Sequence, residues 1–331
     1  MTLPTNGLAD LVGSFQRLFD HDVSDDEARQ FLIEVSEPTH FGQAIAPAAI
    51  SLRQRMEQDR LAIFTPGDAI DVCGTGGDGK HTLNVSTAVA IVVAACGVPV
   101  AKHGNRAASS LAGGADTLEA LGLNLENASA RAEHTLADMN LAFLFAQKHH
   151  PALKWLAPIR KSIGAPTVLN YIGPLCSPAR VTRQLIGVPN LAVFREFTAI
   201  PWDQLGIETV MVVCGAEGLD ELSISGPSHV FAHGFDAADT ITPEEAGLPR
   251  HPLEALKGGD AAHNAEALRK LLTTAPDQNL AYRDAVLLNA AAALIVAGEA
   301  HSWREGVEEA AEVLDKGLAN ALLQCWIKAC D

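Results

Sequence analysis

The stretch Asp71-Val72-Cys73-Gly74-Thr75-Gly76-Gly77-Asp78-Gly79 decides the fold, because it joins a short apolar strand to a helix through a turn crowded with glycine. Glycines let backbone N–H groups approach an anion with no Cβ in the way. The N-terminus of the helix predicted over residues 84–96 adds unpaired donors and partial positive charge. At that terminus lie Asn84, Ser86 and Thr87, where a hydroxyl either caps the helix or binds a metal. By itself the pattern fits a tight turn or an anion site, and it is neither a Walker A motif nor a dinucleotide fingerprint.

A second polar stretch, Lys102-His103-Gly104-Asn105-Arg106, follows the next predicted strand at residues 98–101. Ala107-Ala108-Ser109-Ser110 comes next and is predicted to open a helix. Because the carboxyl ends of neighbouring parallel strands face one crevice, we expect Lys102, Arg106 and the two serines to converge on the anion at the glycine turn. The apolar strand before the lysine argues against a solvent-facing run. The two stretches together predict a phosphate-binding site.

Short apolar strands alternate with helices from residue 68 onward. The predicted strands are residues 69–73, 98–101, 141–145, 184–188 and 209–214. Continuous apolar strands of this kind are typical of a sheet that is covered on both faces. The fold class is therefore α/β, with a mainly parallel central sheet.

The first 66 residues are predicted to be helical and to form a separate small domain. Ser24 opens a capping box, and Pro47 is expected in the first turn of a later helix. The turn Thr65-Pro66-Gly67-Asp68 marks the seam. We expect a small helical domain of residues 1–66, with a contribution from about 150–180, and a large α/β domain of residues 67–331.

The composition limits the classes of partner. A formal net charge of −16 disfavours a duplex nucleic-acid binder, so an anionic substrate needs a local cluster of cations, N–H groups or metal. The longest apolar runs, residues 88–101 and 285–298, are shorter than the roughly 20 residues of a membrane span. With no signal-like N-terminus, we expect a cytoplasmic protein without a membrane partner. The six cysteines form no C-x-x-C pair and are expected to be buried thiols rather than metal or redox groups.

The motifs D-V-C-G-T-G-G-D-G-K-H-T-L-N-V-S-T (71–87) and V-A-K-H-G-N-R-A-A-S-S (100–110) resemble the anthranilate phosphoribosyltransferase family. The likeness continues at residues 150–154, 158–161, 170–175 and 218–221, and it covers essentially the whole chain in the family's order. The resemblance implies a helical domain plus an α/β domain, and a homodimer formed through the helical part. It also implies transfer of phosphoribose from 5-phosphoribosyl 1-pyrophosphate to the amino group of anthranilate, with release of pyrophosphate, in tryptophan biosynthesis.

The resemblance also implies which residues contact the phosphoribosyl pyrophosphate. These are Gly74, Gly77, Asp78, Thr82, Asn84, Val85, Ser86, Thr87, Lys102, His103, Gly104, Asn105, Arg106, Ala107, Ala108, Ser109, Ser110 and Gly114. The implied cofactor is Mg²⁺, with Ser86, Asp220 and Glu221 as its ligands. Two carboxylates and a hydroxyl suit Mg²⁺, which also uses water and substrate phosphates, whereas an acidic pair without this context is usually solvated surface.

For the aromatic acid, the resemblance places Gly74, Asn105 and Arg160 at anthranilate. A guanidinium pairs with a carboxylate through two hydrogen bonds, which gives Arg160 a physical role. His103 is the candidate catalytic residue, and His150 is a second candidate to orient the amine or accept its proton.

Three stretches depart from the family pattern. Cys214-Gly215 stands in place of His-Gly, residues 223–227 replace a Thr-rich run, and Ala165-Pro166-Thr167 replaces a more usual Arg-Thr. These departures concern acceptor specificity and a second metal position rather than the phosphoribosyl site.

Two rival functions remain open. A pyrimidine nucleoside phosphorylase-like enzyme would hold inorganic phosphate at the glycine turn, and the pair Asp220-Glu221 and Arg160 argue against it. A non-catalytic paralogue that binds nucleic acid or regulates is opposed by the intact motifs and the net charge of −16.

Overall fold

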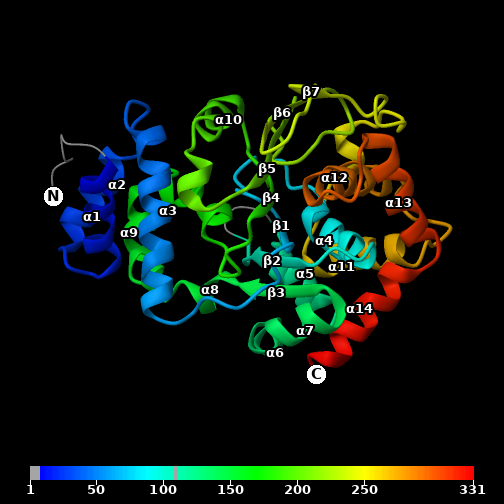
Figure 1. Cartoon of the computed structure of the whole chain (residues 1–331), viewed down its shortest axis with the longest axis horizontal. Helices are drawn as coiled ribbons and strands as arrows, with labels where there is room; N and C mark the ends of the chain where they lie inside the picture. The colour runs from blue at the N-terminus through cyan, green and yellow to red at the C-terminus, as the bar shows by residue number, and fades with distance from the viewer. Residues whose placement is uncertain (1–7, 108–110) are drawn as a thin grey trace.

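A seven-stranded sheet runs through the centre of the protein (Figure 1), and the structure, a computed structural model, describes residues 8–107 and 111–331. The strand order is β3-β2-β1-β4-β5-β6-β7. The first five strands of this order are parallel, and β6 and β7 are antiparallel. The bounds are β1 Ile70–Gly74, β2 Val100–Gly104, β3 Leu141–Phe145, β4 Arg183–Gly187, β5 Thr209–Gly215, β6 Ser228–His233 and β7 Thr240–Ile241. The α/β class with a mainly parallel sheet is confirmed.

One face of the sheet is covered by α4 and α12, which are strongly apolar, and by the helices that pack around them. These are α4 Val85–Ala95, α11 Ala261–Leu272, α12 Leu280–Ala297, α13 Trp303–Asp315 and α14 Leu318–Ala329. Helix α4 packs on α12, and α12 packs on α13. In the described part of the chain, α12 alone is long and apolar enough to cross a membrane, but 78% of it is buried within the fold. That burial is typical of a core helix.

The opposite side carries the N-terminal helices and the middle of the chain (Figure 1). These elements are α1 Leu8–Phe19, α2 Asp25–Glu34, α3 Phe41–Gln58, α9 Leu156–Ile163 and α10 Leu191–Thr198. Their apolar residues, Phe31 and Leu156 among them, form one cluster with Ile186 of β4 and Val212 of β5. The helical part therefore shares its core with one face of the sheet.

Short elements fill the remaining connections. They are α5 Gly114–Ala120, α6 Leu125–Ala130, α7 Ala132–Met139, α8 Ala146–His149, η1 Pro151–Leu153, η2 Val168–Asn170, η3 Gly173–Cys176, η4 Trp202–Leu205 and η5 Leu253–Leu256. The 3₁₀ turns η1 to η3 lie in the Pro- and Gly-rich segment between β3 and β4.

Several local predictions are confirmed and others are wrong. The capping box is present, since Ser24 N donates to Glu27 Oε2 (3.0 Å) and Glu27 N donates to Ser24 Oγ (3.3 Å). Pro47 lies well inside α3 instead of in its first turn, because the helix begins earlier, where Phe41 packs against Tyr171 with ring centroids 5.2 Å apart. Arg131, at φ −104° and ψ 10°, separates α6 from α7.

The second polar stretch also differs from its prediction. Strand β2 continues to Gly104, so that Lys102 and His103 belong to the strand, because β3 pairs with it as far as Phe145. The next helix, α5, begins at Gly114 rather than at residue 107. The carboxylate of Asp116 accepts hydrogen bonds from the N–H groups of Ala107 and Gly113, both at 2.9 Å, which holds residue 107 in a loop ahead of the helix.

Candidate active site

The glycine loop follows β1 at the carboxyl edge of the sheet. Gly76, Gly77 and Gly79 have positive φ angles of 70°, 85° and 68°, a conformation that glycine adopts at little cost. Gly76 N donates to Asp220 Oδ2 at 2.7 Å, so the loop lies against the connection between β5 and β6. A Cβ on Gly74 would lie 2.2 Å from the same carboxylate oxygen. Glycine is therefore required at position 74 by the close approach of Asp220, and at positions 76, 77 and 79 by the backbone conformation.

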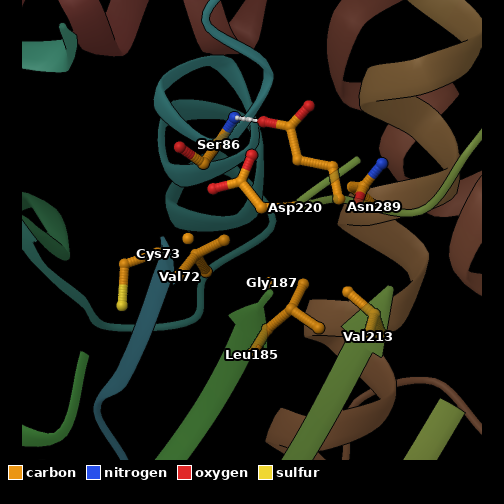
Figure 2. Close-up of a pocket in the computed structure, with 10 residues that line it drawn as sticks. Val72, Cys73, Ser86, Leu185, Gly187, Val213, Asp220 and Asn289 are labelled. Atoms are coloured by element: carbon orange, nitrogen blue, oxygen red, sulfur yellow. Dashed lines mark hydrogen bonds between the residues drawn. The ribbon is translucent and has the colours of Figure 1, made fainter. Parts of the chain in front are cut away.

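The predicted metal ligands come together from two distant segments. Ser86 N, in the first turn of α4, donates to Glu221 Oε1 at 3.2 Å. Figure 2 shows Ser86 facing Asp220 above a pocket whose floor includes Leu185, Gly187 and Val213. A Cβ on Gly187 would lie 1.6 Å from the carbonyl oxygen of Asp220, so the end of β4 admits the acidic turn because it is glycine.

The acidic pair is poorly neutralised by the protein. Burial, with the nearby charge of Asp78, raises the pKa of Asp220 to about 7. Burial and Asp220 raise the pKa of Glu221 well above its ordinary value. Glu221 Oε2 is buried and has no hydrogen-bond partner among the described residues. Carboxylates that repel one another in this way favour a bound cation.

Lys102 is the cation that the protein itself supplies to this centre. Its side chain is 4% exposed, and Nζ donates to Val72 O at 2.7 Å and to Ser86 Oγ at 3.3 Å. Burial lowers the pKa of Lys102, and the negative charge of Asp71 opposes that shift. The ammonium is thus fixed where β1 meets α4. Nearby, a Cβ on Gly114 would lie 2.8 Å from Thr87 Oγ1, so the start of α5 lies close to the first turn of α4.

Arg106 does not join Lys102 at the glycine loop. Its guanidinium forms ion pairs with Asp116 and Glu119, both at 2.8 Å, and lies 5.7 Å from the ring centroid of Phe145. These carboxylates hold the side chain on the exposed side of the loop. The expected convergence therefore applies to Lys102 and not to Arg106.

The side chain of Asn84 forms hydrogen bonds with other groups of the protein. Its Nδ2 donates to Ala112 O at 3.2 Å, and its Oδ1 accepts from Thr117 Oγ1 and from Asn264 Nδ2. The side chain joins the starts of α4, α5 and α11 instead of facing open space. It neither caps α4 nor points at the loop with a free amide.

The other predicted contacts surround this centre. Gly77 and Asp78 belong to the glycine loop, Thr82 pairs with Lys257 in a short antiparallel bridge, Val85 begins α4, Gly104 ends β2, Asn105 and Ala107 lie in the loop after β2, and Gly114 begins α5. Ala108, Ser109 and Ser110 lie outside the described residues.

The residues predicted to bind or activate the acceptor lie on the side of the helical part. His103 and His150 are buried, with ring centroids 5.2 Å apart, and His103 Nδ1 lies 3.2 Å from Gly173 O. Burial, together with the neighbouring imidazoles, lowers the pKa of both, that of His150 to about 4. Both rings are therefore neutral at physiological pH.

Arg160 lies on α9, where burial lowers its pKa. Among the described residues, no carboxylate lies within ion-pairing distance of its guanidinium. A half-buried arginine without an internal carboxylate is suited to bind one from a ligand.

Two residues of the site were missed from the sequence. Asn289 of α12 is 3% exposed, accepts from Leu222 N at 3.0 Å and donates to Leu222 O at 3.1 Å, which fixes the backbone next to Glu221. Asp71 is fully buried and accepts from His103 N at 3.0 Å. The signal for Asn289 was a single amide inside a very apolar helix. The signal for Asp71 was a carboxylate inside an apolar strand.

Comparison with known proteins agrees with this arrangement. A family model described as "Glycosyl transferase family, a/b domain" matches residues 66–320, which gives the class of the protein. The chain is 54% identical to the anthranilate phosphoribosyltransferase of Novosphingobium aromaticivorans over 323 residues, which is 97% of this chain and 96% of the relative. The chain belongs to the anthranilate phosphoribosyltransferase family.

Solved structures show the same fold. Anthranilate phosphoribosyltransferase from Thermus thermophilus is 38% identical and superposes with a TM-score of 0.89, covering 100% of this chain and 96% of that one. The enzyme from Saccharomyces cerevisiae, in complex with PRPP and Mg, is 27% identical with a TM-score of 0.84, over 99% of this chain and 94% of that one.

Proposed function

We propose that this protein transfers the phosphoribosyl group of 5-phosphoribosyl 1-pyrophosphate to the amino group of anthranilate, in tryptophan biosynthesis. The family membership supports this activity, and one observation carries it at the level of the site. The acidic turn accepts hydrogen bonds from Gly76 N of the glycine loop and from Ser86 N at the start of α4, and Lys102 Nζ donates to the hydroxyl of the same Ser86. This combination brings donors, a fixed ammonium and carboxylates to one edge of the sheet, as a pyrophosphate ester requires.

The bond that breaks joins C1 of the ribose to the pyrophosphate oxygen, and the bond that forms joins C1 to the anthranilate nitrogen. Negative charge develops on the departing pyrophosphate, and the amine loses one proton. Backbone N–H groups of the glycine loop and the ammonium of Lys102 are placed to stabilise that charge without reorganising. Lys102 is held for this task by Val72 O and Ser86 Oγ.

We propose Mg²⁺ as the cofactor, with Ser86, Asp220 and Glu221 as its protein ligands. The residues fit a hard cation, because the pKa of both carboxylates is raised and Glu221 Oε2 lacks a partner among the described residues. No group of three or more His, Cys, Asp or Glu side chains in the described part of the chain could hold the ion alone, so water and substrate oxygens would complete the coordination. Bound Mg²⁺ would neutralise charge on the pyrophosphate.

The acceptor is proposed to bind between β2 and α9. Arg160 would pair with the anthranilate carboxylate, with Gly74 and Asn105 nearby. His103 and His150 are neutral, so either can orient the amine or accept its proton. An aryl amine attacking a carbon with oxocarbenium character needs little help from a base.

We further propose the assembly and the location. The helical part, residues 1–66 with about 150–180, would form the interface of a homodimer, and residues 67–331 would form the catalytic α/β domain. The protein would act in the cytoplasm, and the net charge of −16 disfavours a nucleic-acid partner.

A fluorescence assay tests the activity. We expect the fluorescence of anthranilate to fall only when 5-phosphoribosyl 1-pyrophosphate and Mg²⁺ are both present. Phosphorolysis of uridine or thymidine, with no turnover of the proposed pair, would favour a nucleoside phosphorylase instead. If the protein turns over neither pair of substrates but binds nucleic acid tightly, the non-catalytic paralogue is favoured.

A further inference from the structure

The backbone hydrogen-bond ladder of the parallel sheet is shortest between β1 and β2, beside the proposed phosphoribosyl site. Strand β1 pairs with β4 at five successive positions, and β2 pairs with β3 at five positions. Between β1 and β2 the register holds only at Ile70 and Val100. The backbone hydrogen-bond ladder between these two strands therefore stops short of their carboxyl ends, although the strands remain neighbours.

Two side chains take the place of the missing backbone hydrogen bonds. Asp71 Oδ1 accepts from the N–H of His103 at 3.0 Å, and Lys102 Nζ donates to the carbonyl oxygen of Val72 at 2.7 Å. A side chain of each strand thus provides the hydrogen-bond partner for a backbone group of the other strand. The exchange keeps both backbone groups paired while it sends the Lys102 side chain across to β1.

Charge explains why the two residues occur together. Asp71 is 0% exposed and Lys102 is 4% exposed, and a buried ion without a counter-charge is strongly unfavourable. In the proposed function Asp220 and Glu221 bind Mg²⁺. Asp71, in β1, is then the carboxylate whose negative charge neutralises the ammonium of Lys102. The two side chains form no direct ion pair, and Lys102 Nζ donates to Val72 O and Ser86 Oγ, which leaves the third N–H of the ammonium for a ligand.

We propose that Asp71 is a positioning residue of the phosphoribosyl site. It joins β1 to β2 through the N–H of His103, and its charge keeps the Lys102 ammonium at Val72 O and Ser86 Oγ, beside the proposed binding site of the anionic substrate. This role rests on the proposed function of Lys102. Asp71 itself touches no reacting atom.

The first test compares Asp71→Asn with the wild type in steady-state kinetics. Asparagine keeps an oxygen for the His103 N–H but removes the charge, so we expect kcat/KM for 5-phosphoribosyl 1-pyrophosphate to fall about 10-fold to 100-fold. The KM for anthranilate should change by no more than about twofold. Asp71→Glu should recover part of the loss. Wild-type kinetics in Asp71→Asn would overturn the proposal and leave Asp71 as a hydrogen-bond acceptor only.

Ser51→Ala provides the matched stability control. Ser51 is buried in α3, and its hydroxyl donates to Val12 O at 2.8 Å, far from β1 in the chain and in the fold. We expect this variant to lose thermal stability without a selective change in kcat/KM for the sugar substrate. If Ser51→Ala and Asp71→Asn reduce that ratio equally, the effect of Asp71 is general destabilisation and the proposal fails.

A second test uses thermal stability and needs no activity. Alone, Asp71→Asn removes a buried carboxylate but also the counter-charge of Lys102, so it should change the Tm less favourably than the same substitution does when Lys102 is absent. In the Lys102→Met background the same change should raise the Tm, because it removes a buried carboxylate that has lost its cation. Equal Tm changes in both backgrounds would refute the coupling. This test separates failure of the Asp71 proposal from failure of the proposed function, since it does not depend on turnover.

Discussion

The two halves of the site are built in different ways. In the phosphoribosyl half, distant segments are joined by hydrogen bonds, from Gly76 to Asp220 at 2.7 Å and from Lys102 to Val72 at 2.7 Å. In the acceptor half, Arg160 has no carboxylate partner within ion-pairing distance among the described residues, and the rings of His103 and His150 contact each other without a charge between them. The proposed phosphoribosyl half is thus held by hydrogen bonds within the protein, whereas the proposed acceptor half leaves Arg160 free to pair with a ligand carboxylate.

The difference follows from the scaffold beneath each half. The glycine loop, Lys102 and the acidic turn are attached to β1, β2 and β5 of one sheet, which fixes their separation. Arg160 stands on α9, whose packing is with α2 of the helical part. Substitutions in the phosphoribosyl half should therefore damage catalysis, whereas those in the acceptor half should damage binding of one substrate.

The largest effect is expected from Lys102→Met, which removes the fixed ammonium but keeps an apolar stem. We expect kcat/KM for 5-phosphoribosyl 1-pyrophosphate to fall about 1000-fold. Lys316→Met, at an exposed position after α13, is the control and should change the ratio little. A loss in Lys102→Met of less than about fivefold would remove the lysine from the proposed mechanism.

A somewhat smaller effect is expected from Glu221→Gln. The amide oxygen can still accept from Ser86 N, so the fold is kept while one negative charge is lost. We expect about a 100-fold loss of kcat and a higher concentration of Mg²⁺ at half-maximal rate, measured by metal titration. The exposed Glu208→Gln serves as control. An unchanged Mg²⁺ requirement would reject Glu221 as a ligand.

The acceptor half is tested by Arg160→Ala. Loss of a charge-assisted pair with the anthranilate carboxylate should raise the KM for anthranilate about 10-fold to 100-fold. The KM for the sugar substrate should stay within about twofold. Lys161→Ala, at the exposed neighbouring position on α9, should affect neither constant. Equal increases in both KM values would contradict the separation of the two halves.

The smallest expected effect concerns stability and pH at His150. Burial, with the nearby His149, lowers the pKa of His150 from 6.5 to about 4 in the folded protein. The unfolded chain therefore binds the extra proton first, and stability is lost as pH falls from about 6.5 to about 4. Between pH 7 and pH 5 this contribution is about 2 kcal/mol.

The measurement is denaturant unfolding at pH 7 and at pH 5. His150→Gln should lose less stability on acidification than the wild type does, because the neutral amide does not titrate. His301→Gln, at an exposed position, should behave like the wild type. The same loss in His150→Gln as in the wild type would show that His150 is not the group responsible.

Most of the architecture could be predicted, because its signals are local. Apolar runs bounded by glycine predicted five strands, and Ser24 with Glu27 predicted a helix start. The errors arose where a distant partner decided the outcome. β3 extends β2 through Lys102, and the carboxylate of Asp116 delays the start of α5.

The same limit applies to the candidate site. The sequence by itself determined the chemical parts, namely a glycine turn after the first strand, a lysine directly after the second and an acidic pair after the fifth, since residue type and spacing are local properties. Only the tertiary structure decided which of them meet. It joins Lys102 to Ser86, pairs Arg106 with Asp116 and Glu119, and uses Asn289 to hold the acidic turn. The physical reason is that buried charges and amides are satisfied by whichever partners the packed strands and helices bring within hydrogen-bond distance, and that geometry is not written in the spacing of any one motif.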